Sequence, residues 1–394
     1  MMKHRVNVYR HARGYAMLAM IATIGMAATI AIAGLSATIG RNQTTQTTAA
    51  ALAQAKQALI SRAASDANHP GSLPCPDAVT NIAGNNVPND GVADLLAGPA
   101  CPSMIGRLPW RTLGLPDLRD ADGERLWYFV APAYQDSSAK IINPGTAGQI
   151  TGYDCANQEA ASRTWPCDNP RAIGTAWVAV VFSPGKAFGA QVRDAAHAGD
   201  YAQYLESFNP ADPYRLRVAA DAESNDRLAT ISPDDIFAIA QRRIANELQA
   251  VLTKYFAATA AQGSASMPWP AAACTSAVRC AASPLTAPLP AIVRGYLPSD
   301  DSQLNQIMAA QNMTWFDHNQ WRNTLTYLLD ANCADGGNAS QCGNAFAASG
   351  RTQFDANTVL VGGSAGAMAV NTRAALAFGG VSGAQKTRLL IAIQ

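Results

Sequence analysis

The chain opens with a long apolar stretch behind a short basic head. Residues 15–40 carry no charge, whereas Lys3, Arg5, Arg10 and Arg13 precede them. A helix over this stretch would be about 39 Å long, more than the ~30 Å hydrocarbon core of a bilayer. A secretory signal has a shorter apolar stretch, of about 7–15 residues. The pattern therefore predicts a transmembrane anchor with its N-terminus in the cytoplasm.

The helical pattern continues after Arg41 in a more polar form. Ala51, Leu52, Leu59 and Ile60 recur near helical spacing, and no proline interrupts the chain before Pro70. We expect one spine helix over residues 15–66, with an apolar half in the bilayer and an amphipathic half packed on a globular head.

A second helix is predicted after Ser232. Ser232 suits the N-cap, Pro233 the first helical position, and Asp234 and Asp235 the first turn. The apolar positions that follow lie near one helical face: Ile239, Ile244, Leu248 and Leu252.

Apolar stretches predict buried strands at about 125–131, 176–183, 324–330 and 357–362. They fit an antiparallel or mixed sheet on each helix. The closing segment, 387–394, reads as a last strand or as an edge that receives another subunit.

Segments of the second half echo segments of the first in the same order. Residues 51–60 resemble the second helix, and residues 73–78 resemble 267–274. Residues 106–110 likewise match 294–298, and 126–130 match 325–329. The stretch "WVAVVFSPGKAFGAQVR" at 177–193 aligns without a gap on 357–373. Preserved order favours an internal repeat. We expect two tandem, related α+β modules, each with a helix on a small sheet.

The composition narrows the classes of partner. The net charge is +1 and only 14% of residues are charged, compared with about 25% in soluble proteins. Nucleic acid is therefore not expected as a partner. The sparse charge suits packing against other subunits, and an alanine-rich genome is the alternative explanation.

All eight cysteines follow the apolar stretch. They form no Cys-x-x-Cys, and the five histidines do not cluster near them, so a zinc site is not expected. An even number beyond a membrane segment indicates disulfides in an oxidising compartment, with reduced buried thiols as the alternative. We predict that cysteines next to each other in the sequence form the pairs: Cys75–Cys101, Cys155–Cys167, Cys274–Cys280 and Cys333–Cys342.

A basic leader ending in Gly14, then Tyr15 and an apolar helix that becomes amphipathic, resembles a type IV prepilin or type II secretion pseudopilin. "GSLPCPD", "GRLPWRTLGLPDLRD" and "ERLWYFVAP" are similar to stretches of large minor-pilin-like proteins. The resemblance implies cleavage after Gly14 by a prepilin peptidase. It divides the chain into a leader (1–14), a spine (15–66), a first head module (67–228) and a second, duplicated one (229–394).

The resemblance also implies where the protein would act. It would be a single-pass inner-membrane protein with its C-terminal head in the periplasm, and would join other pilin or pseudopilin subunits in a cell-surface filament. Pilins usually carry Glu at the fifth mature position, where this chain has Ala19. Ala19 therefore favours a position at the filament tip or, alternatively, an anchor that is never cleaved.

The function expected is that of a non-enzymatic minor pilin or pseudopilin that serves assembly or surface interaction. The alternative is an uncleaved, anchored periplasmic binding protein or adhesin. A serine hydrolase is a third possibility, because "GGSAG" around Ser364 fits a nucleophile elbow. No Asp, Glu or His follows Ser364, which argues against that reading.

Carboxylates around glycine occur in two loops. Such clusters suit calcium, but the full EF-hand spacing is absent and a simple turn leading into the strand at Leu126 is the preferred explanation. The candidate ligands are Asp90, Asp94, Asp120 and Asp122. No cofactor is expected.

Overall fold

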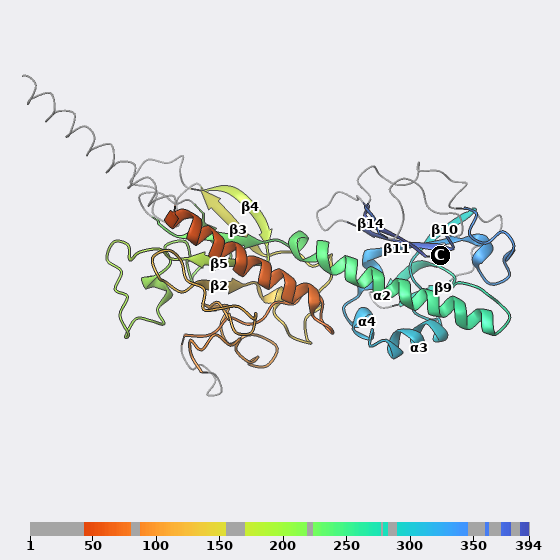
Figure 1. The fold of residues 1–394 in the computed structure, drawn as a ribbon, viewed down its shortest axis with the longest axis horizontal. Helices are drawn as coiled ribbons and strands as arrows, with labels where there is room; N and C mark the ends of the chain where they lie inside the picture. The colour runs from red at the N-terminus through yellow and green to blue at the C-terminus, as the bar shows by residue number, and fades with distance from the viewer. Residues whose placement is uncertain are drawn as a thin grey trace, which may run out of the picture.

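The computed structural model describes residues 43–79, 87–154, 170–218, 224–276, 279–282, 290–345, 359–361, 372–379 and 387–393. These residues form an α+β fold of two units, each with a helix laid along a sheet (Figure 1). The first unit spans residues 43–231 and the second spans 233–393. The helix over 43–65 covers the first sheet, and α2 (Pro233–Ala261) runs from the first unit into the second.

The first unit has a four-stranded antiparallel sheet in the order β1-β2-β5-β7. A three-stranded sheet, β4-β3-β6, lies apart from it, with β3 antiparallel to β4 and parallel to β6. The strands and short 3-10 helices of this unit are β1 (Ile105–Arg107), β2 (Trp127–Val130), η1 (Pro132–Tyr134), β3 (Ile150–Asp154), β4 (Arg171–Trp177), β5 (Ala179–Ser183), η3 (Tyr201–Gln203), β6 (Arg215–Arg217) and β7 (Arg227–Ile231).

The first sheet is buried on both faces. Tyr128 and Val181 join the core that includes the helix over 43–65, whereas Trp127 and Phe129 join a second core with Tyr204. Every residue of β2 and β5 is buried. Burial on both faces explains why these strands read as continuous apolar stretches rather than alternating ones.

The helix over 43–65 is amphipathic, as its sequence spacing predicts. Ala51, Leu52, Leu59 and Ile60 are all buried against the first sheet. A helix with one apolar side packs that side on a core and turns the other outward.

The second unit has a five-stranded mixed sheet in the order β10-β11-β13-β14-β12. Its strands pair antiparallel except β12 with β14, which are parallel. The closing strand β14 therefore lies inside the sheet and not at its edge. The elements after α2 are β8 (Ala271–Ser276), β9 (Arg279–Ala282), β10 (Ile292–Gly295), α3 (Ser302–Ala310), α4 (Trp315–His318), η4 (Trp321–Thr324), β11 (Leu325–Asp330), η5 (Ala331–Cys333), β12 (Val359–Val361), β13 (Ala374–Gly379) and β14 (Thr387–Ile393).

The start of α2 is fixed by its own sequence, and the prediction of this helix is confirmed. The Ser232 side chain accepts from the Asp235 backbone N–H, the Asp235 carboxylate accepts from the Ser232 N–H, and Pro233 opens the helix. This capping box satisfies backbone donors that have no partner within the helix.

The two units share a local arrangement beside their first strands. A Cβ added to Gly106 in β1 would lie 2.5 Å from the Asp77 carbonyl oxygen, and one added to Gly295 in β10 would lie 2.5 Å from that of Ala271. Only glycine permits so close an approach of a neighbouring chain. In both units a proline precedes the residue whose carbonyl makes the contact.

One match within the expected internal repeat, that of residues 177–193 with residues 357–373, is wrong. Tyr128 of β2 lies opposite Val181 of β5, and Tyr327 of β11 lies opposite Leu376 of β13. The counterpart of β5 is therefore β13, whereas residues 357–373 contain β12, which pairs at the other edge of the sheet. An apolar stretch specifies a buried strand but not its partner, so the gap-free alignment chose the wrong one.

The units are joined by polar contacts as well as by a shared core. The buried Asn319 side chain accepts from the Ile142 N–H (3.2 Å) and donates to the Trp315 carbonyl (3.0 Å). The Asn143 side chain donates to the Asn319 carbonyl (2.8 Å). Residues 142–143 of the first unit are thus fixed to the turn after α4 in the second.

The predicted transmembrane spine and single-pass inner-membrane location are wrong for the part of the chain that the structure describes. Within those residues, no helix combines the length and the apolar character needed to cross a bilayer. The longest helix among the described residues, α2, carries charged residues along its length, among them Arg242, Arg243, Glu247 and Lys254. Residues 15–42, the predicted apolar half of the spine, lie outside the described residues. The fold class is therefore corrected from α+β with a transmembrane spine to α+β alone, for the residues that the structure describes.

Replacing Asn319 by alanine tests the polar joint between the units. Asn319→Ala removes two hydrogen bonds and leaves the Ile142 N–H buried without a partner. We expect the free energy of unfolding, measured by chemical denaturation, to fall by about 2–3 kcal/mol. The exposed Asn344→Ala is the matched control and should change it by less than about 0.5 kcal/mol. Equal effects of the two variants would contradict the role given to Asn319.

Candidate functional site

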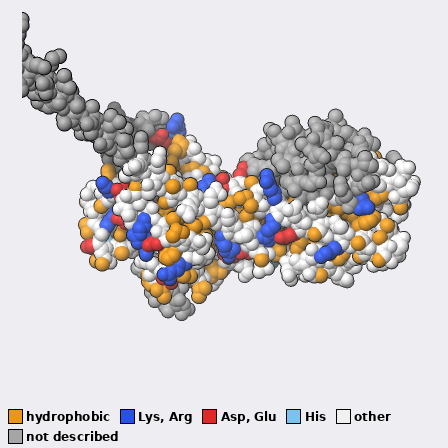
Figure 2. All heavy atoms as spheres, viewed as in Figure 1, with side chains coloured by type: hydrophobic (Ala, Val, Ile, Leu, Met, Phe, Trp, Pro, Cys, Tyr) orange, Lys and Arg blue, Asp and Glu red, His pale blue; other side chains and the backbone are white. Residues whose placement is uncertain are grey.

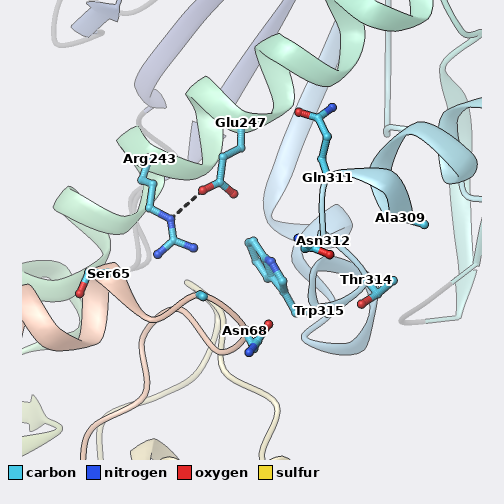
Figure 3. A pocket seen from close by; sticks show the side chains of 10 residues that line it. Ser65, Asn68, Arg243, Glu247, Ala309, Gln311, Asn312, Thr314 and Trp315 are labelled. Atoms are coloured by element: carbon cyan, nitrogen blue, oxygen red, sulfur yellow. Dashed lines mark hydrogen bonds and ion pairs between the residues drawn. The ribbon is translucent and has the colours of Figure 1, made fainter.

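A hollow of about 550 Å³ lies where the two units meet. We call it the junction hollow. Its wall comes from three segments: the end of the helix over 43–65, the middle of α2, and the chain from the end of α3 to the start of α4 (Figure 3). The lining residues are Ser65, Ala67, Asn68, Arg243, Glu247, Ala309, Gln311, Asn312, Thr314 and Trp315.

The first segment is held by Asp66. One carboxylate oxygen accepts from the N–H groups of Asn68 (3.0 Å) and His69 (2.8 Å), and the other pairs with Arg62 (2.6 Å). Burial acts to raise the pKa of Asp66, but Arg62 and these N–H groups outweigh it and lower the pKa below its usual value. The fixed turn presents Asn68 at the rim of the junction hollow.

Arg243 joins α2 to the helix over 43–65. Its Nη1 donates to the carbonyl oxygens of Ala64 (3.0 Å) and Asp66 (2.8 Å), and its Nε donates to Glu247 Oε1 (2.8 Å). The last carbonyls of a helix have no partner within it, and a cation is favourable at that end. Within the described residues, Arg243 Nη2 and Glu247 Oε2 form no further hydrogen bond.

The third segment turns through Asn312, which has a φ of 58°. The N–H groups of Gln311 and Met313 both return to the Met308 carbonyl (3.1 and 3.0 Å), which ends α3. Asparagine tolerates this left-handed conformation better than most residues. The turn places the Asn312 side chain opposite Asn68 (Figure 3).

Trp315 stands between Asn68 and Asn312 with its ring toward the Arg243–Glu247 pair (Figure 3). Its ring contacts Trp321 edge-on, with centroids 6.3 Å apart, and only 6% of the residue is exposed. An aromatic ring packed on another ring loses little further freedom when a ligand arrives.

Several polar groups in the junction hollow lack a hydrogen-bond partner in the described part of the chain. No hydrogen bond of the Asn68, Asn312 or Thr314 side chains is formed within the described residues, and Gln311 Nε2 is buried without a partner. Amides and hydroxyls both donate and accept. The hollow thus offers mixed hydrogen-bonding capacity beside an aromatic ring, which suits binding better than proton transfer.

Of the residues singled out by the sequence, those that the structure describes do not line the junction hollow. Gly14, Tyr15, Ala19 and Ser364 lie outside the described residues. Their predicted roles in processing, assembly and hydrolysis remain sequence predictions.

Two of the expected disulfides are present, Cys75–Cys101 and Cys333–Cys342. The backbone of β8 and β9 sets Cys274 directly opposite Cys280. Cys155 and Cys167 lie outside the described residues. The choice of sequence neighbours is therefore confirmed for two pairs.

The candidate calcium ligands serve their own turns. Asp120 accepts from the N–H groups of Asp122 and Glu124 and, with its other oxygen, from Ser183 and Gly185, so it ties its turn to the end of β5. The described residues contain no group of three His, Cys, Asp or Glu side chains arranged to hold a metal. In the other loop, Asp90 accepts from the Val92 N–H and Asp94 from the Ala78 N–H.

Sequence reasoning missed the junction hollow because its three segments are far apart in the chain. The one local signal was the spacing of Arg243 and Glu247, four residues apart on a helix, which favours an ion pair. Nothing in the sequence indicated that Asn68 and Asn312 would face each other.

A buried carboxyl near the first disulfide has an unusual environment. Asp77 is only 1% exposed, and its Oδ2 accepts from the Gly91 N–H (2.7 Å) while Oδ1 has no partner within the described residues. Burial raises the pKa of Asp77 to about 6, with Asp90 and Asp94 adding to the rise.

Asp77 should therefore make stability fall as the pH rises. Because its pKa is higher in the folded than in the unfolded protein, the native state holds more protons between about pH 4 and 6, and the contribution of Asp77 is lost across that window. Asp77→Asn lacks this titration. From pH 4 to 7.5, we expect wild type to lose up to about 3 kcal/mol relative to the variant in denaturant titrations. A constant difference would refute the assignment.

Comparison with protein-family models, with curated proteins and with solved structures found no match to this chain. Its function is therefore proposed from its own sequence and structure.

Proposed function

We propose that the chain is a non-enzymatic minor subunit of a pilin-like or pseudopilin-like filament, placed at or near its tip. The observation that carries the proposal is the exposed side of the helix over 43–65, where every fully exposed position holds an uncharged residue. This side would pack against helices of other subunits.

Both charged residues of this helix are engaged within the molecule. Lys56 pairs with Asp235 of α2 (3.1 Å), and Arg62 pairs with Asp66 (2.6 Å) and Asp136 (3.5 Å). The exposed residues are small or carry neutral polar groups: Gln43, Thr44, Thr45, Gln46, Thr47, Ala49, Ala50, Ala53, Gln54, Gln57, Ser61 and Ser65.

An uncharged side is unusual for a helix that faces only water, since such helices generally carry charges outward. Small side chains let two helices approach closely. Burying the exposed positions of this side against a neighbour would desolvate no unpaired ion of the helix, because Lys56 and Arg62 are already paired; an unpaired buried ion would cost several kcal/mol. Charged side chains are also scattered, with no large patch of one sign, over the face in Figure 2. The helix is therefore suited to a protein interface.

The size of the body supports a minor position in the filament. Two units share one hydrophobic core, and a disulfide closes the loop between Cys75 and Cys101. So large a body is harder to repeat in a helical lattice than to place at an end. Alanine in place of the usual glutamate at position 19 agrees with an end position, where no neighbour lies above.

The proposed partners are other pilin or pseudopilin subunits and the prepilin peptidase that would cut after Gly14. They rest on the resemblance of the N-terminal sequence and on the "LPCPD" and "LPWRTLGL" stretches.

A charge on the exposed side of the helix tests the assembly role. Ala53→Arg should leave folding intact, because Ala53 is exposed, but should require a buried, unpaired cation in the filament. We expect at least a tenfold smaller share of the protein in isolated filaments by immunoblot, with the free energy of unfolding changed by less than about 0.5 kcal/mol. The control is Ala257→Arg at an exposed position of α2. Normal incorporation of Ala53→Arg would rule out this interface.

The mature N-terminus tests the proposed processing. We expect mass spectrometry of the protein from its native cells to find Tyr15 as the first residue, and Met1 in cells without the prepilin peptidase. Gly14→Leu should also leave the leader in place, since the peptidase of this family cuts after glycine. An intact leader in wild-type cells would contradict membership of the pilin-like class.

A binding protein or adhesin that never enters a filament is the second candidate. The junction hollow, with its unpartnered polar groups beside Trp315, favours it. Such a protein would keep its leader, and Ala53→Arg would leave its binding unchanged.

A further inference from the structure

We propose that the junction hollow binds a neutral sugar ring. The inference concerns a ligand and goes beyond the proposed assembly role, which uses the exposed side of the helix over 43–65, whereas the hollow meets that helix only at its last residue, Ser65. It rests on the charge balance of the hollow, on the mixture of free donors and acceptors, and on the fixed aromatic ring in its wall.

The charges at the junction hollow cancel. Among the described residues that line it, Arg243 and Glu247 are the only charged ones, and they already pair at 2.8 Å. A phosphate or carboxylate would have to compete with Glu247 for the guanidinium, and a cation would face Arg243. The site therefore suits an uncharged ligand.

The free groups match hydroxyl chemistry. Arg243 Nη2 can donate, Glu247 Oε2 can accept, and the Asn68, Asn312 and Thr314 side chains can do both. A sugar hydroxyl is likewise both donor and acceptor, and neighbouring hydroxyls on a ring can engage a planar amide or carboxylate with two bonds. Hydrogen bonds from a sugar hydroxyl to the charged Arg243 or Glu247 would be stronger than those to the neutral side chains.

Trp315 supplies the apolar part of the recognition. The C–H groups on a sugar ring can pack against an aromatic side chain, which has an apolar body and one polar N–H. Trp315 is held in place by Trp321 and Phe316, with ring centroids 6.3 and 5.9 Å away. The Asn68 and Asn312 side chains flank its ring (Figure 3), so polar and apolar contacts could be made at once.

The size and rigidity of the site also fit a small ligand. Its volume of about 550 Å³ lies within the roughly 300–1,000 Å³ of small-molecule sites. The turn at Asp66, the turn at Asn312 and the contacts of Arg243 fix all three segments before binding, which lowers the ordering cost. A peptide is less well matched, because the free polar groups are side chains and none of the described lining residues belongs to a strand.

The test uses the purified full chain and a panel of neutral sugars: glucose, galactose, mannose, N-acetylglucosamine, N-acetylgalactosamine and their disaccharides. Binding is detected by saturation-transfer NMR and quantified by titration calorimetry. We expect at least one sugar to bind saturably. Glucuronate and glucosamine, as charged analogues, should bind no better than the neutral sugars.

Asn312→Gly is the main variant, because glycine keeps the left-handed backbone and removes only the side chain. We expect it to weaken sugar binding at least about fivefold, the factor for losing one hydrogen bond. Asn68→Ala should do the same from the opposite rim. Asn89→Gly is the matched control, since Asn89 has the same φ of 58° in the first unit, away from the hollow, and should leave binding unchanged.

Several results would overturn the proposal. They are the absence of saturable binding by every sugar of the panel, equal binding by wild type, Asn312→Gly and Asn68→Ala, or preferential binding of a charged analogue or of a random peptide library. Ala53→Arg should bind sugar like wild type, so that loss of assembly and loss of sugar binding are separate outcomes.

Discussion

The packing of α2 against both units is the constraint on which the rest of the structure depends. This helix of 29 residues is buried along one side from Ile236 to Thr259. Near its start, Phe237 contacts Tyr134 of the first unit and Trp321 of the second. Further along, the helix lies against β14 and α3. The apolar side of α2 belongs to one continuous core that includes both sheets. A shift of either sheet would therefore leave gaps in the packing around the other.

The junction hollow is a consequence of this joint. Arg243 lies on α2 where the helix over 43–65 ends, and the free carbonyls of that end draw its guanidinium. Glu247 pairs with the same guanidinium and balances its charge. The turns at Asn68 and Asn312 form two sides of the hollow. A joint between two rigid bodies leaves space where polar ends meet and cannot pack like a core. Binding sites are found preferentially at such boundaries.

The two proposed roles use different sides of the molecule. The helix over 43–65 buries its apolar side on the first sheet and keeps uncharged residues at its exposed positions. Its two charged residues, Lys56 and Arg62, are paired within the chain with Asp235, Asp66 and Asp136. The junction hollow meets this helix only at its last residue, Ser65. A subunit could therefore pack along its helix and still present the hollow to a ligand.

The sequence by itself determined the features whose cause is local. The capping residues around Ser232 set the start of α2, the apolar stretches located β2, β5, β11 and β12, and nearness in the chain paired Cys75 with Cys101 and Cys333 with Cys342. Tertiary structure alone decided that β13 occupies the place of β5 and that Arg243 meets Asn68 and Trp315 at one hollow. The reason is physical: capping and short loops are specified by neighbouring residues, whereas strand partners and sites between units depend on which distant surfaces are buried together.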